Sequence, residues 1–192
     1  MRKRWFTLIL SVLAMAPLWA ADPPAKAPIR VSEDGFPSGS VTPEGAACDL
    51  ARAFIRRNGM LFMKVCMPPF GAPESKDAYQ DFLDKVVGDM TKGEAPANGP
   101  KKLAKCFAAR HLSKDGPASY GSASFGFQDV MFVDVGVFLE DNQPQLCRTQ
   151  VIKTKDGKWM ALPRPGLYPL LSTGMNQEGP SQVDFSEAYT VE

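Results

Sequence analysis

The chain has 192 residues, of which 44% are hydrophobic, 22 are basic and 21 are acidic, giving a formal net charge of +1. That length suits one domain with an ordinary hydrophobic core. The balanced charge excludes the strongly basic surface that is typical of nucleic-acid-binding proteins. The sequence also lacks an H-E-x-x-H motif, cysteine and histidine pairs at metal-ligand spacing, and a glycine-rich phosphate loop. We therefore expect no nucleic-acid partner, no metal and no cofactor.

The first 20 residues have the pattern of a secretory signal peptide. Arg2, Lys3 and Arg4 precede an apolar run over residues 6–16, and Ala20 offers a small residue for cleavage. A retained membrane anchor is the alternative, but the apolar run is short for a spanning helix. We expect a bacterial protein that is exported to the periplasm or secreted, with no membrane attachment after cleavage. The remaining chain would have 19 basic and 21 acidic residues, a net charge of −2.

The four cysteines all follow the predicted signal segment, at Cys48, Cys66, Cys106 and Cys147. An even number of cysteines in an exported chain predicts two disulfides, for which three connectivities are open. Buried free thiols are the alternative.

Residues 21–41 are rich in proline, serine and glycine, and predict a flexible lead-in to the domain. A first helix then begins at the N-cap Thr42, with Pro43 in its first turn, and ends at Asn58 and Gly59. One apolar stripe at helical spacing consists of Ala47, Leu50, Ala51, Phe54 and Ile55.

Three further helices are predicted, over residues 60–67, 73–91 and 100–112. The first of them is rich in methionine, which we interpret as adaptable core; a soft binding surface is the alternative. Four strands follow, over residues 118–127, 130–139, 145–154 and 158–162. Residues 166–192 predict a weakly structured tail. Helices first and antiparallel strands afterwards are typical of the α+β class.

Alternation along residues 130–139 predicts which face of the sheet is buried. The apolar side, which the helices should cover, carries Met131, Val133, Val135, Val137 and Leu139. A turn centred near Asn142 would pair Val135 with Thr149 and Asp134 with Gln150. A type I′ turn at Asp156-Gly157 would pair Lys155 with Lys158 and Val151 with Leu162.

The opposite, outer side of the sheet is predicted to carry an apolar patch that fits a partner or a second copy of the chain. Its members are Phe132, Phe138, Ile152 and Trp159. Phe132, Phe138 and Trp159 are the predicted binding residues.

The order of elements, the TPEGAACDLARAFI helix and the closing KTKDGKWMAL hairpin resemble the nuclear-transport-factor-two-like superfamily, over about residues 42–162. The resemblance implies a domain over residues 42–165 with the cystatin-like fold, in which N-terminal helices pack on a curved antiparallel sheet. It further implies a cavity between helices and sheet, and often dimerisation through the outer sheet face. Members include ketosteroid isomerases, dehydratases, polyketide-cyclase-like enzymes and exported proteins without known activity, so the fold does not imply a reaction.

Three residues are weak catalytic candidates. Asp134, flanked by phenylalanines, could have a raised pKa and act as a general base, and Tyr120 could donate to an enolate. The alternation of side chains along residues 130–139 instead places Asp134 on the outer side of the sheet, away from the helices. His111, the sole histidine, sits where it would interact favourably with the end of the predicted fourth helix.

Two functions remain open. The first is an exported, non-catalytic binding domain of envelope or immunity type. It would hold a small apolar ligand in the cavity, or a protein partner or second copy on the sheet face. The second is a small lyase or isomerase that uses Asp134 as general base.

Overall fold

The computed structural model describes residues 29–92, 99–111, 126–139, 142, 144–163 and 190–191. The predicted signal segment, Tyr120 and most of the predicted tail lie outside these residues. No helix within the described part is long and apolar enough to cross a membrane.

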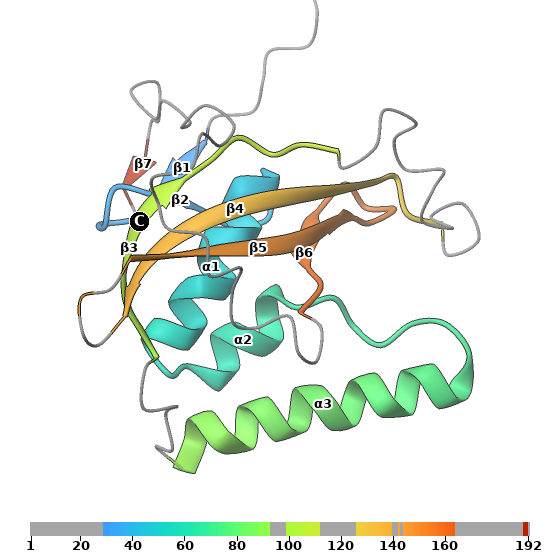
Figure 1. The fold of residues 1–192 in the computed structure, drawn as a ribbon. Coiled ribbons are helices and arrows are strands. Elements are labelled where there is room, and N and C mark those ends of the chain that lie inside the picture. The colour runs from blue at the N-terminus through green and yellow to red at the C-terminus, as the bar shows by residue number, and fades with distance from the viewer. Residues whose placement is uncertain are drawn as a thin grey trace, which may run out of the picture.

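Three helices precede a four-stranded antiparallel sheet (Figure 1). The helices are α1 (Pro43–Ile55), α2 (Gly59–Val65) and α3 (Pro73–Lys92). The sheet order is β3-β4-β5-β6, with β3 (Pro100–Cys106), β4 (Asp129–Leu139), β5 (Pro144–Lys153) and β6 (Trp159–Ala161). A small second sheet has the order β2-β1-β7, with β1 (Arg30–Val31), β2 (Pro37–Ser38) and β7 (Thr190–Val191). The predicted α+β class, with N-terminal helices on a curved antiparallel sheet, is confirmed.

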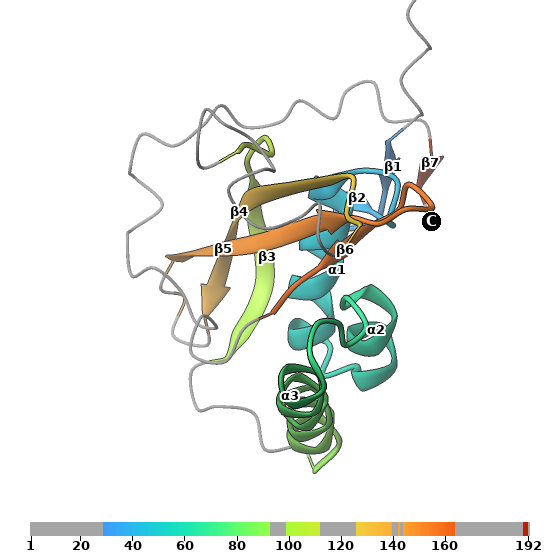
Figure 2. The same cartoon turned by 90° about the vertical axis from the view of Figure 1, so that its right-hand side faces the viewer.

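The helix α1 lies directly on one face of the sheet, and α3 lies at the end of the molecule away from it (Figure 2). The side of α1 that meets the sheet is built from small residues, which let helix and sheet approach closely. The core at this contact includes Ala46, Ala47, Cys48, Ala51, Val133, Val135, Val137 and Val151. The predicted buried face of β4 is therefore confirmed.

The predicted fourth helix is wrong, because residues 100–106 form the strand β3. Leu103 and Cys106 are its buried residues, and their spacing of three looked helical. A register irregularity between Leu103 and Lys105 inserts one residue into the alternation. Such a bulge shifts the inward-facing positions from a spacing of two to three. The predicted interaction of His111 with the end of that helix is therefore also wrong.

The β4–β5 hairpin has a register two residues from the predicted one, with Asp134 opposite Arg148 and Val135 opposite Cys147. Because side chains alternate with a period of two, this shift leaves every residue on its predicted face.

The β5–β6 hairpin differs by one residue, which reverses the faces of β6. Lys153 pairs with Trp159, and the turn between them closes with a bond from the Gly157 N–H to the Thr154 carbonyl. Gly157 has a φ of 82° while Asp156 does not enter the left-handed region, so the turn is not type I′. Trp159 consequently packs in the core under α1 and is only 7% exposed, which corrects its predicted place on the outer face.

The methionines of the second apolar run divide between core and surface. Met67 is buried beside Val130 and Ile152, as an adaptable core residue should be. Met60 and Met63 on α2 are 86% and 40% exposed, so the core interpretation is wrong for these two.

Candidate functional site

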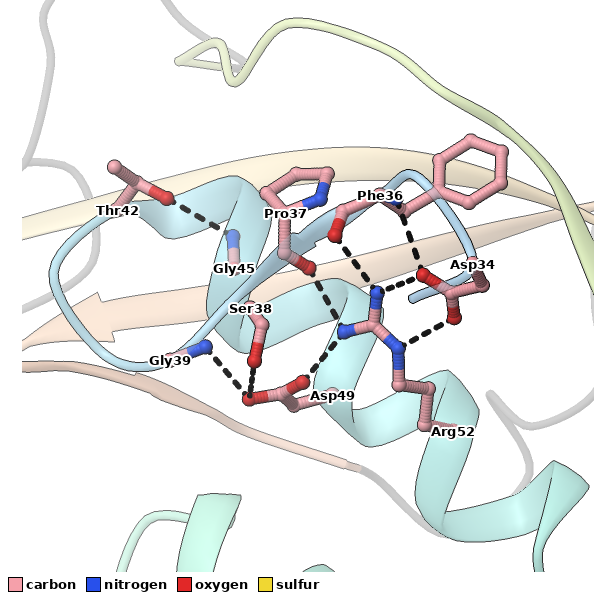
Figure 3. Close-up of polar contacts among 9 residues, drawn as sticks. All are labelled: Asp34, Phe36, Pro37, Ser38, Gly39, Thr42, Gly45, Asp49 and Arg52. Atoms are coloured by element: carbon pink, nitrogen blue, oxygen red, sulfur yellow. Dashed lines mark hydrogen bonds and ion pairs between the residues drawn. The ribbon is translucent and has the colours of Figure 1, made fainter. Parts of the chain in front are cut away.

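An open cleft of about 800 Å³ lies along one side of α1. Its walls come from β1 and the loop after β2, from α1 and α2, and from the hairpin that leads into β6. Residues 30–41, predicted to belong to a flexible lead-in, thus form one wall. Their attachment to α1 depends on a few buried polar contacts (Figure 3).

Arg52 on α1 ties this wall to the domain, and it is only 2% exposed. Its Nε and one Nη2 proton donate to Asp34 Oδ2 and Oδ1 at 2.7 and 2.6 Å. The second Nη2 proton goes to the Phe36 carbonyl at 2.9 Å. The two Nη1 protons go to the Pro37 carbonyl at 2.8 Å and to Asp49 Oδ1 at 2.6 Å. All five donors of the guanidinium are used, so Arg52 holds the wall and has none left for a ligand.

The Asp34–Arg52 pair is electrostatically matched. Burial alone would raise the pKa of Asp34, but the hydrogen bonds and charge of Arg52 outweigh it and lower that pKa. Burial alone would lower the pKa of Arg52, and Asp34 reverses that effect. Both groups therefore stay ionised, as a buried guanidinium requires a paired carboxylate.

Asp49, one turn before Arg52, holds the loop after β2. Its Oδ2 accepts the Gly39 N–H at 2.7 Å and the Ser38 hydroxyl at 3.5 Å. Gly39 has a φ of 85°, which a glycine adopts without steric penalty. This carboxylate is a structural acceptor that fixes the loop against the helix.

The start of α1 touches the same loop closely. Thr42 is the N-cap and accepts the Gly45 N–H at 3.1 Å, as its sequence position predicted. A Cβ built on Gly45 would lie 2.9 Å from the Ser38 carbonyl oxygen and closer still to that of Gly39. Gly45 is therefore required for the loop to lie against the helix.

The cleft has a surplus of positive charge. Five basic and three acidic residues line it. Two of the basic ones are already paired, Arg52 with Asp34 and Asp49 as above and Lys158 with Asp156 at 2.8 Å. The hydrogen bond from Lys158 is the main reason why the pKa of Asp156 falls to about 2. Arg56 and Lys64 are exposed on the α1 and α2 side.

An apolar strip runs beside these cations. Val41, in the loop after β2, is 46% exposed, and Leu61 and Val65 line the cleft from α2. Trp159 and Met160 line the cleft from β6. The cleft therefore combines exposed positive charge with apolar surface.

The structure places the predicted catalytic residues away from this cleft. Asp134 is 3% exposed on the outer face of the sheet. It accepts bonds from Arg148 Nε at 2.7 Å and Nη2 at 2.9 Å, and from Arg110 Nη2 at 2.8 Å. His111 Nε2 lies 2.8 Å from Asp129 Oδ1. Neither Asp134 nor His111 lines the cleft, and Tyr120 is outside the described residues.

The predicted outer apolar patch is smaller than expected. Phe132 and Phe138 are half-buried on the outer face, whereas Trp159 is on the other side. Ile152 is 1% exposed and packs with Met67. Only the two phenylalanines remain of the predicted patch.

All four cysteines are free and buried, so the predicted two disulfides are not present. Cys106, Val135 and Cys147 form one row across β3, β4 and β5 on the helix side, and Cys48 belongs to the same core cluster. Cys66 packs in a second cluster with Leu83 of α3. The thiols act as small core residues, and the described residues hold no metal-binding cluster.

The anchoring residues of the cleft escaped the sequence prediction. Arg52, Asp34 and Asp49 carry no motif, and Arg52 lies off the apolar stripe of α1. One local signal was present, because Asp34-Gly35 between two short extended segments is typical of a hairpin turn. Gly35 does have a φ of 79°, and β1 pairs with β2 around it.

No protein-family model and no curated protein matches this chain. Among solved structures, it is similar to one from Campylobacter jejuni that carries the provisional name NTF2-like transpeptidase. The two chains are 17% identical with a TM-score of 0.43, and the match covers 64% of this chain and 99% of the other. The order of helices and strands and the antiparallel sheet by themselves establish the α+β fold of this chain.

Proposed function

We propose that this protein is an exported, non-catalytic binding domain whose cleft holds an anionic ligand with an apolar part. The observation that carries the proposal is the exposed pair Arg56 and Lys64 beside the apolar residues Val41, Leu61 and Val65. A cation pair over apolar surface suits a carboxylate, sulfonate or phosphate that is attached to a hydrophobic group. Export is expected from the signal-like residues 1–20.

The rigid wall supports binding. The loop that carries Val41 is fixed to α1 through Asp49, and the hairpin before it is fixed through Arg52. A preformed wall loses little conformational entropy when a ligand binds, which favours affinity.

The chemistry of the cleft favours binding over catalysis. Its described lining contains no histidine and no cysteine. Its buried carboxylate, Asp49, is occupied by Gly39 and Arg52. A general base must reach the substrate's proton with a vacant lone pair. Glu33, the remaining acidic residue of the lining apart from the paired Asp156, is exposed to solvent and has no histidine or cysteine beside it in the described lining.

The isomerase alternative has little geometric support. Asp134 lies on the face of the sheet opposite α1, and both of its oxygens accept bonds from arginines. Each oxygen already accepts at least one of these hydrogen bonds, and the carboxylate is buried beneath the two arginines, so it is poorly placed to take a proton from a substrate.

Fluorescence titration with 8-anilinonaphthalene-1-sulfonate tests the proposal, because this probe joins a sulfonate to apolar rings. The site variant is Arg56→Glu with Lys64→Glu. The control is Lys76→Glu with Lys92→Glu, two exposed residues of α3 that give the same change in net charge. We expect about a tenfold rise in Kd for the site variant and no change for the control, in line with one or two lost charge contacts.

The uncharged analogue N-phenyl-1-naphthylamine separates charge from apolar attraction. It should bind the wild type more weakly than the sulfonate and should not distinguish the two variants. Equal loss of sulfonate binding in both variants, or equal affinity for both probes, would contradict an anion site in the cleft. Matching thermal midpoints of the variants exclude probe binding to unfolded protein.

A further inference from the structure

The face of the sheet turned away from α1 carries a second concentration of positive charge, separate from the cleft. Pairing places Lys102 opposite Phe138 and Lys105 opposite Gly136, both outer-facing positions of β4. Arg110 forms an isolated antiparallel β-bridge with Phe132, and Arg148 lies opposite Asp134 in the β4–β5 register. The outer face therefore holds four basic residues, which are Lys102, Lys105, Arg110 and Arg148.

Asp134 is the sole acidic residue at the described outer-facing positions of β3, β4 and β5. The surplus on this face is thus three positive charges, in a chain whose basic and acidic residues otherwise nearly balance. Asymmetric charge of this kind raises the rate and the specificity of association with a partner of opposite sign.

The buried carboxylate orients the two arginines. Asp134 is 2% exposed at its side chain, while those of Arg110 and Arg148 are 37% and 32% exposed. Arg148 uses Nε and Nη2 toward Asp134, and Arg110 uses Nη2. One carboxylate therefore fixes two guanidinium groups at the surface and neutralises only one of them. Fixed guanidinium groups are the preferred partners of carboxylates, since they offer paired donors in a plane.

Apolar anchors flank the charges. Phe132 and Phe138 are half-buried on the same face, and the Lys102 ammonium lies 4.8 Å from the centre of the Phe138 ring. Six residues of strand separate the two rings, which corresponds to about 20 Å. That spacing suits two anchor points on an extended polypeptide, with acidic side chains between them. It is too long for rings that stack neighbouring bases of a nucleic acid.

We infer that this outer sheet face docks an acidic polypeptide segment of a partner protein. A second copy of the chain fits less well, because a twofold interface would bring the same positive face against itself. This inference is independent of the cleft, and it replaces the apolar patch expected from the sequence with a charged surface that has two aromatic anchors.

The test uses fluorescence anisotropy with labelled poly-L-glutamate as the acidic polypeptide. The site variant, Lys102→Glu with Lys105→Glu, changes the face without exposing the buried Asp134. The control is Lys76→Glu with Lys85→Glu on α3, which changes the net charge equally. We expect the site variant to lose about tenfold in affinity and the control less than twofold, at low salt where such contacts are strongest.

A second variant, Arg148→Lys, keeps the charge and removes the planar pair of donors. It should weaken poly-L-glutamate binding severalfold. Because Arg148 also donates two hydrogen bonds to the buried Asp134, the variant should unfold at a lower temperature, and binding is compared well below its unfolding midpoint. Absence of binding by the wild type, or equal losses in site variant and control, would overturn the inference. Tighter binding of a twenty-nucleotide poly-deoxythymidine or of anionic phospholipid vesicles through the same lysines would also overturn it. So would a concentration-dependent dimer that both site variants abolish.

Discussion

Asp34 and Arg52 meet side by side, with Nε donating to Oδ2 at 2.7 Å and Nη2 to Oδ1 at 2.6 Å. The two residues are 18 positions apart, one in the β1–β2 turn and one in the middle of α1. This pair makes the N-terminal hairpin part of the domain and gives the cleft one of its walls. The hairpin itself has only two-residue strands, which could not hold that position through their own pairing.

Removal of the carboxylate should therefore loosen the wall. We expect Asp34→Ala to lower the free energy of unfolding by about 2 kcal/mol, because two donors of a buried guanidinium lose their partner. Urea denaturation measures the change, and hydrogen exchange should show faster exchange in residues 30–41. The matched control is Glu33→Ala, an exposed neighbour that also lines the cleft, which should change stability by less than about 0.5 kcal/mol. Equal effects of the two substitutions would show that the pair does not anchor the hairpin.

The same pair predicts a dependence of stability on acid pH. The pKa of Asp34 is lowered in the folded chain, so the unfolded chain binds the proton more readily. The stabilisation is present above the unfolded pKa of about 4, and it is lost as pH falls through the folded pKa. Urea denaturation of the wild type and of Asp34→Asn between pH 6 and pH 2.5 should show a stability difference that shrinks toward low pH. A difference that stays constant over this range would refute the assignment.

The sequence predicted the large-scale fold because its strongest signals are periodic. The Val133, Val135 and Val137 alternation and the N-cap Thr42 each depend on neighbours within a few residues, and the structure confirms both. The predicted faces of β4 are correct even though the predicted β4–β5 register was wrong by two residues. Local regularity was therefore enough to order the helices and the sheet.

The prediction of individual strands failed where one additional residue shifts the alternation of inward-facing and outward-facing side chains. A bulge in β3 gave Leu103 and Cys106 a helical spacing, and one extra turn residue before β6 moved Trp159 to the other face. The cleft was missed for a different reason. Arg52 is an ordinary surface residue in the sequence, and its two carboxylates come from separate segments that only the tertiary fold brings together.

Two of the helical glycines, Gly45 and Gly88, should respond in opposite ways to alanine. At Gly88 nothing lies within 4 Å of an added Cβ, so the higher helix propensity of alanine should stabilise the protein by about 0.5–1 kcal/mol. At Gly45 the Cβ would meet the carbonyl oxygens of Ser38 and Gly39, and these are backbone atoms that cannot rotate away. We expect Gly45→Ala to destabilise by about 2 kcal/mol and to weaken sulfonate-probe binding in the cleft. Thermal unfolding of both variants measures the contrast, and stabilisation by Gly45→Ala would mean that the loop does not press against α1.

The four cysteines should behave as unreactive free thiols in the folded protein. Each is at most 3% exposed, and burial raises the pKa of the Cys48 and Cys66 thiols, which lowers the fraction of reactive thiolate. Without reductant, Ellman's reagent at pH 8 should label no cysteine rapidly in the native protein and four after denaturation in guanidinium. A parallel sample denatured with reductant, which is removed before labelling, fixes the total and serves as the control. If the unreduced, denatured sample showed two or fewer thiols and the reduced control showed four, the protein would contain a disulfide.

Rapid labelling of the native protein would instead show that the core around Cys48 or Cys66 opens readily. A slow labelling rate that follows the unfolding rate, with all four thiols lost together, is the outcome that buried core thiols predict.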